Sequence, residues 1–409
     1  MNCRFCSSKL EHVFVDLGAC PPSNSFLSKY QLDNPEIHYP LKLNVCSKCF
    51  LVQVDEHKAA SEIFCDEYVY FSSFSQTWLD FARNYVETIV KRLKLDAESF
   101  VVEIASNDGY LLQFVKAKQI PCLGVEPSGG TAAVAVAKGI EVIQDFFGTK
   151  LAKKLVAQGR QADLLIGHNV LAHVPDINDF VEGLKIALKP DGTVNMQFPH
   201  LMQLVANNQF DTIYHEHFSY LSLLAAQKIF AAHGLIVYDL EEIPVHGGSL
   251  RVYARHAGYS TLEVSSNVNA LLARERALGM DTLAYYDNFQ SVVNKTKYDF
   301  LEFLIHQKKL GKKISAYGAA AKGNTLLNYC GIKKDLVDFV VDASPHKQGK
   351  FLPTSRIPVV KESRLKEEKP DFVLVLPWNI KEEIMEQLKY IRGWGGKFVI
   401  AIPKLEIVG

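Results

Sequence analysis

Residues 101–112 read VVEIASNDGYLL, and this stretch decides the fold of the chain. A short apolar strand runs to Ala105, a turn of small and polar residues follows, and a helix opens at Tyr110. A strand, turn and helix in this order place backbone amides beneath a nucleotide-like ligand at the carboxyl edge of a parallel sheet. The turn lacks the GxGxxG pattern that a pyrophosphate needs for close approach, so it favours an adenosyl group without phosphates.

The next apolar strand supports an adenosyl ligand, because it ends in Gly124-Val125-Glu126-Pro127. A carboxylate at that position can accept hydrogen bonds from both ribose hydroxyls. Glu103, Gly109 and Glu126 together fit S-adenosylmethionine (SAM), with Glu103 near its amino-acid end. The alternative is that the two glutamates only close their strands. The predicted cofactor residues lie at the ends of successive strands: Glu103, Ala105, Ser106, Asn107, Gly109, Tyr110, Leu111, Glu126, Pro127, Asp145, Phe146, Phe147, Asn169, Val170 and His173.

Strands and helices alternate on both sides of this motif, which indicates an α/β chain. Continuous apolar runs between helical stretches predict a parallel sheet covered on both faces. We expect a helix over residues 74–95 in front of it and a hairpin over 235–256 at its end. Residues 267–311 are predicted to form connecting helices. A second, smaller doubly wound sheet should run from about Gly311 to the end.

Composition excludes several classes of protein. The 409 residues are 48% hydrophobic, so the chain is neither disordered nor fibrous. The 45 Lys and Arg residues balance 45 Asp and Glu residues, so there is no overall field to attract nucleic acid or anionic lipid. The first residues do not resemble a secretory signal, and no stretch approaches the roughly 20 apolar residues that span a bilayer. We expect a cytoplasmic protein without a nucleic-acid or membrane partner; its oligomeric state stays open.

Four of the eight cysteines form two CxxC pairs, Cys3 with Cys6 and Cys46 with Cys49. Zn²⁺ prefers tetrahedral sulfur, and a CxxC turn directs two sulfurs at one ion. The spacing therefore predicts a zinc site, and four cysteines leave no open position, which makes the metal structural. The alternative is a set of buried or coincidental cysteines. The others, Cys20, Cys65, Cys122 and Cys330, are expected in the core.

A second strand–turn–helix motif begins at residues 314–317 and continues through Gly318-Ala319-Ala320-Ala321-Lys322-Gly323-Asn324. Helix-terminal amides and a lysine suit a phosphate, such as the pyrophosphate of a nucleotide sugar. No GxxxxGK[ST] pattern is present, so ATP hydrolysis has no support. The alternative is a close-packed turn with a solvated lysine. Predicted substrate residues on this side are Gly318, Lys322, Gly323, Asn324, Asp342, Lys347 and Trp378, with Ser344, His346 and Asn379 beside them.

The densest run of acid–base groups is YHEHFSY at residues 214–220, so we expect the reaction centre here. In an extended backbone, Tyr214 and Glu216 would share one side. A helical turn would instead bring Tyr214 and His217 onto one face. Two alternatives are a buried structural histidine and a metal site at His215 and His217, which lacks a third ligand nearby.

Motifs along essentially the whole chain point to one family. They are the CxxC pairs, YVYFSS at 68–73, EIASNDGYLL at 103–112, GVEPS at 124–128, DFF at 145–147, NVLAHVPD at 169–176, YHEHFSY at 214–220, VHGGSLRVY at 245–253 and YGAAAKGNTLLNY at 317–329. Their order resembles that of SAM-dependent C-methyltransferases acting on nucleotide-linked deoxy-keto-sugars, such as the 3-C-methyltransferase of tetronitrose biosynthesis. One departure is Ala105, where methyltransferases usually have glycine; alanine is small enough that we expect binding to survive.

The resemblance implies methyl transfer to a thymidine-diphosphate 4-keto-deoxysugar, at C3. Methylating a carbon beside a ketone requires a base for its proton and a donor for the enolate oxygen. The resemblance places Tyr214, Glu216 and His217 in the active site, with His217 as the base. It also implies a catalytic tyrosine in YVYFSS, which we assign to Tyr70 rather than Tyr68. His246 and Arg251, in VHGGSLRVY, are implied as substrate residues.

The implied organisation has three parts. Residues 1–70 form a zinc-binding module, residues 71–258 a class I (Rossmann-like) SAM methyltransferase domain, and residues 259–409 helices followed by a doubly wound domain for the nucleotide sugar. Two other functions remain open. One is a nucleotide-sugar oxidoreductase or epimerase, suggested by the two doubly wound domains; the other is a zinc-ribbon binding module, suggested by the CxxC pairs.

Overall fold

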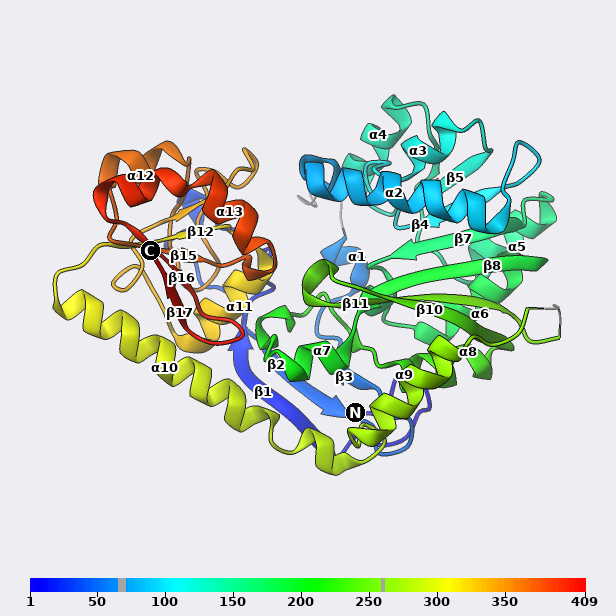
Figure 1. Cartoon of the computed structure of the whole chain (residues 1–409), viewed down its shortest axis with the longest axis horizontal. Coiled ribbons are helices and arrows are strands. Elements are labelled where there is room, and N and C mark those ends of the chain that lie inside the picture. The colour runs from blue at the N-terminus through cyan, green and yellow to red at the C-terminus, as the bar shows by residue number, and fades with distance from the viewer. Residues whose placement is uncertain (65–70, 259–261) are drawn as a thin grey trace.

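Three sheets organise the part of the chain that the computed structural model describes, residues 1–64, 71–258 and 262–409. Figure 1 shows the six-stranded C-terminal sheet at the left and the seven-stranded central sheet at the right, with the strands of the N-terminal module between them. The predicted α/β class and the order of its three parts are confirmed. The predicted boundaries at residues 70 and 258 border segments outside the described ranges and stay predictions.

The central sheet has the strand order β10-β11-β8-β7-β4-β5-β6. Neighbours from β8 to β6 pair in parallel, while β10 and β11 pair antiparallel, which confirms the predicted hairpin. Buried side chains of α2 and α3 pack on one face of the sheet, and those of α5, α6 and α8 pack on the other. The strands are β4 (Val101–Ile104), β5 (Cys122–Val125), β6 (Glu141–Ile143), β7 (Ala162–His168), β8 (Leu188–Pro199), β10 (Leu235–Ile243) and β11 (Ser249–His256); the helices are α2 (Gln76–Leu93), α3 (Leu112–Ala117), α4 (Gly129–Ala137), α5 (Thr149–Ala157), α6 (Ile177–Ala187), α7 (Leu201–Ala206) and α8 (Leu223–Ala232).

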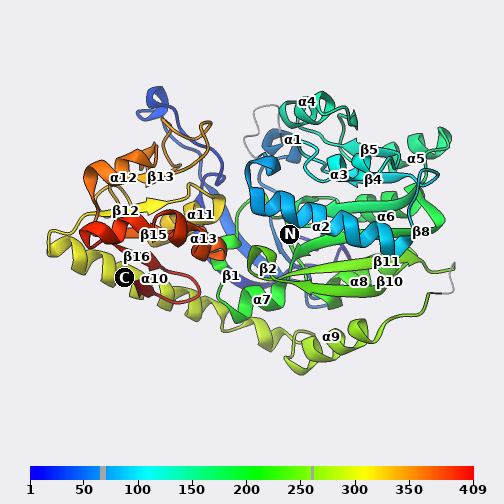
Figure 2. The same cartoon turned by 45° about the horizontal axis from the view of Figure 1, so that its top comes forward.

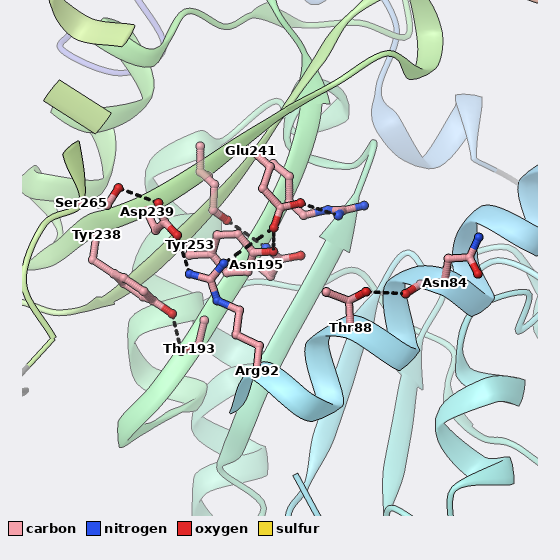
Figure 3. Close-up of polar contacts among 12 residues, drawn as sticks. Asn84, Thr88, Arg92, Thr193, Asn195, Tyr238, Asp239, Glu241, Tyr253 and Ser265 are labelled. Carbon is pink, nitrogen blue, oxygen red and sulfur yellow. Dashed lines mark hydrogen bonds and ion pairs between the residues drawn. The ribbon is translucent and has the colours of Figure 1, made fainter. Parts of the chain in front are cut away.

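Helix α2 is fastened across its face of the sheet by polar contacts near its C-terminal end (Figure 3). The Arg92 guanidinium pairs with Asp239 of β10 at 2.5 Å and lies 3.9 Å from the ring centre of Tyr253 in β11. The Tyr253 hydroxyl donates to Glu241 at 2.6 Å. An ion pair and a stacked guanidinium each require one relative orientation of their groups. Together these contacts fix the rotation of α2 about its own axis, which non-directional apolar packing defines less well.

The C-terminal domain begins after two linking helices, α9 (Ser266–Ala277) and α10 (Phe289–Lys309), as predicted. Figure 2 shows α10 running beneath the domain that it leads into. The sheet has the order β14-β13-β12-β15-β16-β17 and is parallel except for β17. Its elements are β12 (Ile314–Tyr317), α11 (Ala321–Cys330), β13 (Val340–Val341), β14 (Val359–Val360), α12 (Ser363–Glu368), β15 (Phe372–Val375), α13 (Lys381–Gln387), β16 (Lys397–Ile400) and β17 (Glu406–Val408).

The N-terminal module is built on an antiparallel sheet that borrows a strand from the middle of the chain. Its order is β1 (His12–Cys20), β2 (Tyr39–Val45), β3 (Val52–Val54) and β9 (Ser219–Tyr220). The short α1 (Ala60–Ile63) follows β3 in the chain. Strand β9 belongs to the YHEHFSY run, and its Tyr220 pairs with Val52. The predicted reaction centre is therefore held directly by the N-terminal module.

No helix among the described residues has the length and apolar character to cross a bilayer.

Three residues of the turn after β4 have a left-handed backbone: Ala105, Asn107 and Gly109, with φ of 55°, 50° and 73°. A Cβ on Gly109 would lie 2.4 Å from Ile140 Cδ1, so that side chain would have to shift, and the positive φ adds strain for any other residue. Ala105 carries a Cβ, so its left-handed backbone is strained by about 1 to 2 kcal/mol.

We expect Ala105→Gly to raise the free energy of unfolding by about 1 kcal/mol, because glycine adopts positive φ without strain. The thermal midpoint of the central domain should rise by roughly 2 to 4 °C. Scanning calorimetry measures both, and Gly109→Ala serves as the contrast that should lower the midpoint. A lower midpoint for Ala105→Gly would show that Ala105 is not strained.

Candidate active site

A cavity of about 670 Å³ opens where the central domain, the N-terminal module and the C-terminal domain meet. All three parts contribute to its wall. The structure brings together at this cavity the following predicted residues: Ala105, Asn107, Tyr110, Glu126, Pro127, Asp145, Phe146, Phe147, Asn169, Val170, His173, Tyr214, Glu216, His217, His246, Lys322 and Lys347.

The central-domain wall presents the Glu126 carboxylate at the end of β5. The backbone amides of Asn107 and Ser128 each donate to one of its oxygens at 2.9 Å. Burial raises the pKa of Glu126, and these two hydrogen bonds oppose the rise. Glu126 lines the cavity, so its carboxylate is placed to accept from the vicinal hydroxyls of a ribose. The aromatic rings of Phe146 and Phe147 border the same wall, which fits an adenosyl group.

Four predicted cofactor residues do not line the cavity: Glu103, Ser106, Gly109 and Leu111. Gly109 shapes the turn from behind. Glu103 is 1% exposed and shares the face of β4 with Val101, which packs against α2 and α3, so its side chain lies on that side of the sheet. Burial raises the pKa of Glu103 well above its ordinary value. The strand ends at the predicted place, but alternate residues face opposite sides of the sheet.

The opposite wall carries a tight turn at residues 214–217, which we call the catalytic turn. The His217 amide donates to the Tyr214 carbonyl at 3.0 Å, so the backbone turns here and is not extended. This turn places the Tyr214 hydroxyl 2.8 Å from His217 Nε2. His217 Nδ1 lies 2.9 Å from the Thr212 carbonyl.

These contacts fix the protonation of His217. A carbonyl oxygen only accepts, so Nδ1 carries the proton, Nε2 carries the lone pair, and Tyr214 donates to it. Burial, together with the nearby His173, holds the pKa of His217 well below its ordinary value. The imidazole is therefore neutral at neutral pH, with an unprotonated nitrogen at the cavity.

His173 and Glu216 complete this wall. The His173 ring centre lies 4.6 Å from that of His217, and its Nδ1 donates to the Glu216 carbonyl at 2.7 Å. Burial lowers the pKa of His173 to about 4 and raises that of Glu216. Asn24 of the N-terminal module donates to Glu216 Oε1 at 3.3 Å. The second oxygen, Oε2, is buried without a partner, as expected of a group that awaits a ligand.

His215 points away from the cavity, since its Nε2 donates to the Tyr39 and Pro40 carbonyls in the N-terminal module, at 3.3 and 3.2 Å. The alternative of a metal site shared by His215 and His217 has no geometric support, because the two rings face different surroundings.

Contacts from both flanking parts hold the catalytic turn. On one side, β9 pairs with β3. On the other, the Thr325 hydroxyl of α11 donates to the Ile213 carbonyl at 2.8 Å, and the Trp378 indole donates to Asp211 at 2.7 Å. The predicted reaction centre lies between the N-terminal module and the C-terminal domain.

The C-terminal wall presents two lysines to the cavity. Lys322 Nζ donates to Asn379 Oδ1 at 2.6 Å and lies 4.7 Å from the Trp378 ring centre. Burial lowers the pKa of Lys322, while the charge of Asp211 opposes this. Lys347 Nζ donates to the Ala319 carbonyl at 2.8 Å. This pair of cations suits an anionic ligand such as a diphosphate.

The other predicted substrate residues do not line the cavity: Gly318, Gly323, Asn324, Asp342, Trp378 and Arg251. Asn324 donates to the Ser23 carbonyl at 2.6 Å, and Asp342 accepts from the Ala319 amide at 2.8 Å, so both shape the wall. Arg251 pairs with Glu241 at 2.9 Å and lies 4.6 Å from the Tyr85 ring centre, beneath α2.

Tyr70 and Tyr68 fall on residues 65–70, outside the described residues, so the assignment of a catalytic tyrosine there stays a prediction.

Several cavity residues had no functional signal in the sequence. Trp78 belongs to a helix whose periodicity indicated only packing, and His168 ends an ordinary apolar strand. Asn169 Nδ2 donates to His246 Nε2 at 2.8 Å, a link that no local pattern reveals. Further cavity residues without a signal in the sequence are Asn24, Ser61, Phe64, Asp179, Phe180 and Thr212.

The four paired cysteines form the predicted cluster. Their sulfurs lie within 4.8 Å of one another, with Cys3 and Cys49 at 3.5 Å and Cys6 and Cys46 at 3.5 Å. A tetrahedral zinc ion with Zn–S bonds of about 2.3 Å sets its sulfurs about 3.8 Å apart, so the residues fit zinc. Gln53 of β3 donates to the Cys3 sulfur at 3.3 Å.

Comparisons with known proteins agree with this geometry. Three family models match the chain: a zinc binding domain over residues 3–64, a methyltransferase domain over 78–240 and a C-methyltransferase C-terminal domain over 244–403. The C-methyltransferase NovU of Streptomyces niveus is 33% identical over 407 residues, covering 100% of this chain and 96% of NovU.

Solved structures match over less of the chain. The CcbJ methyltransferase from Streptomyces caelestis is 13% identical, with a TM-score of 0.35, over 43% of this chain and 89% of CcbJ. Magnesium protoporphyrin IX methyltransferase from Synechocystis PCC 6803 is 14% identical, with a TM-score of 0.34, over 43% of this chain and 81% of that protein.

We expect Cys49→Ser, or treatment with a strong chelator, to remove zinc and lower the thermal midpoint, because the cluster closes the module that contains β3. Elemental analysis and calorimetry measure the two effects. Cys122→Ser, outside the cluster, is the control and should keep its zinc. A metal-free variant that melts like the wild type would contradict a structural role.

Asp211 should make stability depend on pH. Burial raises its pKa to about 6, against about 3.9 in an unfolded chain. The folded state thus binds the proton more tightly, so the stabilisation is complete below pH ~4 and is lost as pH rises through ~6. Relative to Asp211→Asn, which cannot titrate, the wild type should lose up to roughly 3 kcal/mol across this window. A difference in unfolding free energy that is constant with pH would contradict this.

Proposed function

Because the chain belongs to the SAM-dependent C-methyltransferase family, we propose that it methylates C3 of a thymidine-diphosphate 4-keto-deoxysugar. The observation that carries this proposal is the neutral His217, whose Nε2 lone pair lies in the same cavity as Glu126 and the two lysines of the C-terminal wall. A base, a ribose acceptor and a cationic wall in one cavity match the needs of this reaction.

Deprotonation is the first step that the residues support. Ketones acidify the neighbouring C–H bond, and the unprotonated His217 Nε2 takes that proton. The Thr212 carbonyl accepts from Nδ1 and so stabilises the imidazolium that forms. SAM, when bound, supplies a methyl group on a sulfonium that the resulting carbanion can attack in line.

Tyr214 then stabilises the enolate by hydrogen bonding. It donates to His217 Nε2 in the resting site, at 2.8 Å. Nε2 has one lone pair, so the Tyr214 hydroxyl turns away from it before the substrate proton is taken, and it then donates to the developing enolate oxygen. The protonated imidazole cannot accept again, which keeps the hydroxyl directed at the enolate.

The remaining walls orient the substrate. Glu216 has a buried, unpartnered oxygen that can accept from a sugar hydroxyl. Lys322 and Lys347 provide positive charge for the diphosphate on the C-terminal side. Burial lowers the pKa of His246 to about 4, so this residue adds no competing charge.

The direct test incubates the protein with SAM and a panel of thymidine-diphosphate keto-sugars, and reads product mass for the gain of one methyl group. Methylation of a 4-keto-deoxysugar, with the label located at C3 by NMR, is the expected result. No methylation of any keto-sugar in the panel, with SAM bound, would reject the proposed substrate class.

We expect His217→Asn to keep SAM affinity and abolish both methyl transfer and exchange of the substrate's α-proton with solvent, because the lone pair at Nε2 is lost. Calorimetry measures SAM binding, and deuterium incorporation measures exchange. His215→Asn is the matched control, because His215 faces the N-terminal module. Exchange at the wild-type rate in His217→Asn would remove His217 from its role.

A further inference from the structure

Arg4 lies between the first two cysteines of the zinc cluster, yet its side chain leaves the cluster and extends toward the central domain. Its Nη1 donates to the Pro175 carbonyl at 2.8 Å, and its Nη2 donates to the Val54 carbonyl at 2.6 Å. Burial lowers its pKa, and the charges of Glu56 and nearby acids oppose this, so the guanidinium stays charged.

One of the two carbonyls, that of Pro175, belongs to a residue that lines the cavity, and the other belongs to β3, the strand that pairs with β9 after the catalytic turn. Pro175 lines the cavity and belongs to the same loop as Asn169, Val170 and His173, which are predicted cofactor residues. Val54 donates its amide to the Phe218 carbonyl at 3.2 Å, and Phe218 directly follows His217. The Arg4 guanidinium also lies 5.4 Å from the Phe218 ring centre.

The backbone of Arg4 is fixed as firmly as its side chain. Its amide donates to Gln53 Oε1 at 2.8 Å, and its carbonyl accepts from Asn178 Nδ2 at 3.2 Å. The CxxC turn around it is closed by the cysteine cluster. A planar guanidinium with two fixed acceptors has one geometry, which a lysine ammonium cannot reproduce.

We propose that Arg4 is a positioning residue for methyl transfer: it holds the cofactor loop at Pro175 and the strand beside the catalytic turn at a fixed separation. The inference rests on the proposed function, because it assumes that a donor methyl and a deprotonated carbon face each other across this cavity. A displacement of about 1 Å between reacting groups lowers the rate by about 100-fold.

Loss of Arg4 affects the two walls unequally. The catalytic turn keeps its pairing through β3 and β9 and its contacts with Thr325 and Trp378. The loop at Pro175 loses its hydrogen bond from the Arg4 guanidinium, while the backbone carbonyls of residues 4 and 5 still accept from Asn178. Deprotonation should therefore continue in the variant, while SAM binding and methyl transfer should suffer.

The experiment compares wild type, Arg4→Ala and the matched control Arg160→Ala. Arg160 also combines an ion pair, with Glu141 at 2.7 Å, and a ring contact, with Phe100 at 5.2 Å, but it lies outside the cavity lining. For Arg4→Ala we expect unchanged zinc content, a KM for SAM raised several-fold, kcat for methyl transfer lowered about 10- to 100-fold, and α-proton exchange within a few-fold of wild type. Millimolar guanidinium should restore part of kcat in Arg4→Ala, and Arg4→Lys should not behave as wild type.

Two results would overturn the inference: wild-type kinetics in Arg4→Ala, or equal loss of zinc, thermal stability, exchange and transfer, which would make Arg4 only a structural part of the cluster. Calorimetric SAM affinity keeps this test separate from the proposed function. If the wild type methylates no keto-sugar, SAM affinity still tests the role of Arg4. Weaker SAM binding by Arg4→Ala than by Arg160→Ala then supports a positioning role for Arg4, and equal binding rejects it.

Discussion

The hydrogen bond from His217 Nδ1 to the Thr212 carbonyl, at 2.9 Å, is the contact on which the proposed reaction centre depends. It sets the tautomer, and the tautomer decides which nitrogen faces the cavity with a lone pair. The bond needs residues 212 and 217 to stay at a fixed separation, although only a short turn joins them. Contacts from α11 and Trp378 hold the residues before the turn, and β3 holds those after it. The proposed proton transfer to His217 therefore depends on contacts from all three parts of the chain, which hold the turn rigid.

Local patterns in the sequence were enough for the fold class and for much of the site. Apolar runs between amphipathic stretches predicted the parallel strands, and the amphipathic helix expected over residues 74–95 is α2, Gln76–Leu93. The CxxC pairs predicted the cysteine cluster, since each pair is a local turn. Strand-end residues such as Glu126 and Asn169 line the cavity because the carboxyl ends of parallel strands share one edge.

Features that depend on distant pairing or on side-chain parity were not predictable in this way. Nothing local to Ser219 and Tyr220 marks them as a strand of the N-terminal sheet. Glu103 and Arg251 lie on strands at the expected places but point beneath α2, because a change of one residue reverses the face. Arg4 lies between two cysteines without any prediction attached to it, and its partners at Pro175 and Val54 are visible only in three dimensions.

The borrowed strand has a consequence for synthesis on the ribosome. Until residues 219–220 emerge, β3 is an open edge of the sheet, with amides and carbonyls ready to pair with any extended chain. The metal cluster, by contrast, needs only the first 49 residues. A nascent chain can therefore bind its metal early and still expose the unpaired edge of β3 while most of the central domain is being translated. Because β3 spans only Val52–Val54, its exposed edge offers few backbone groups for pairing with another chain.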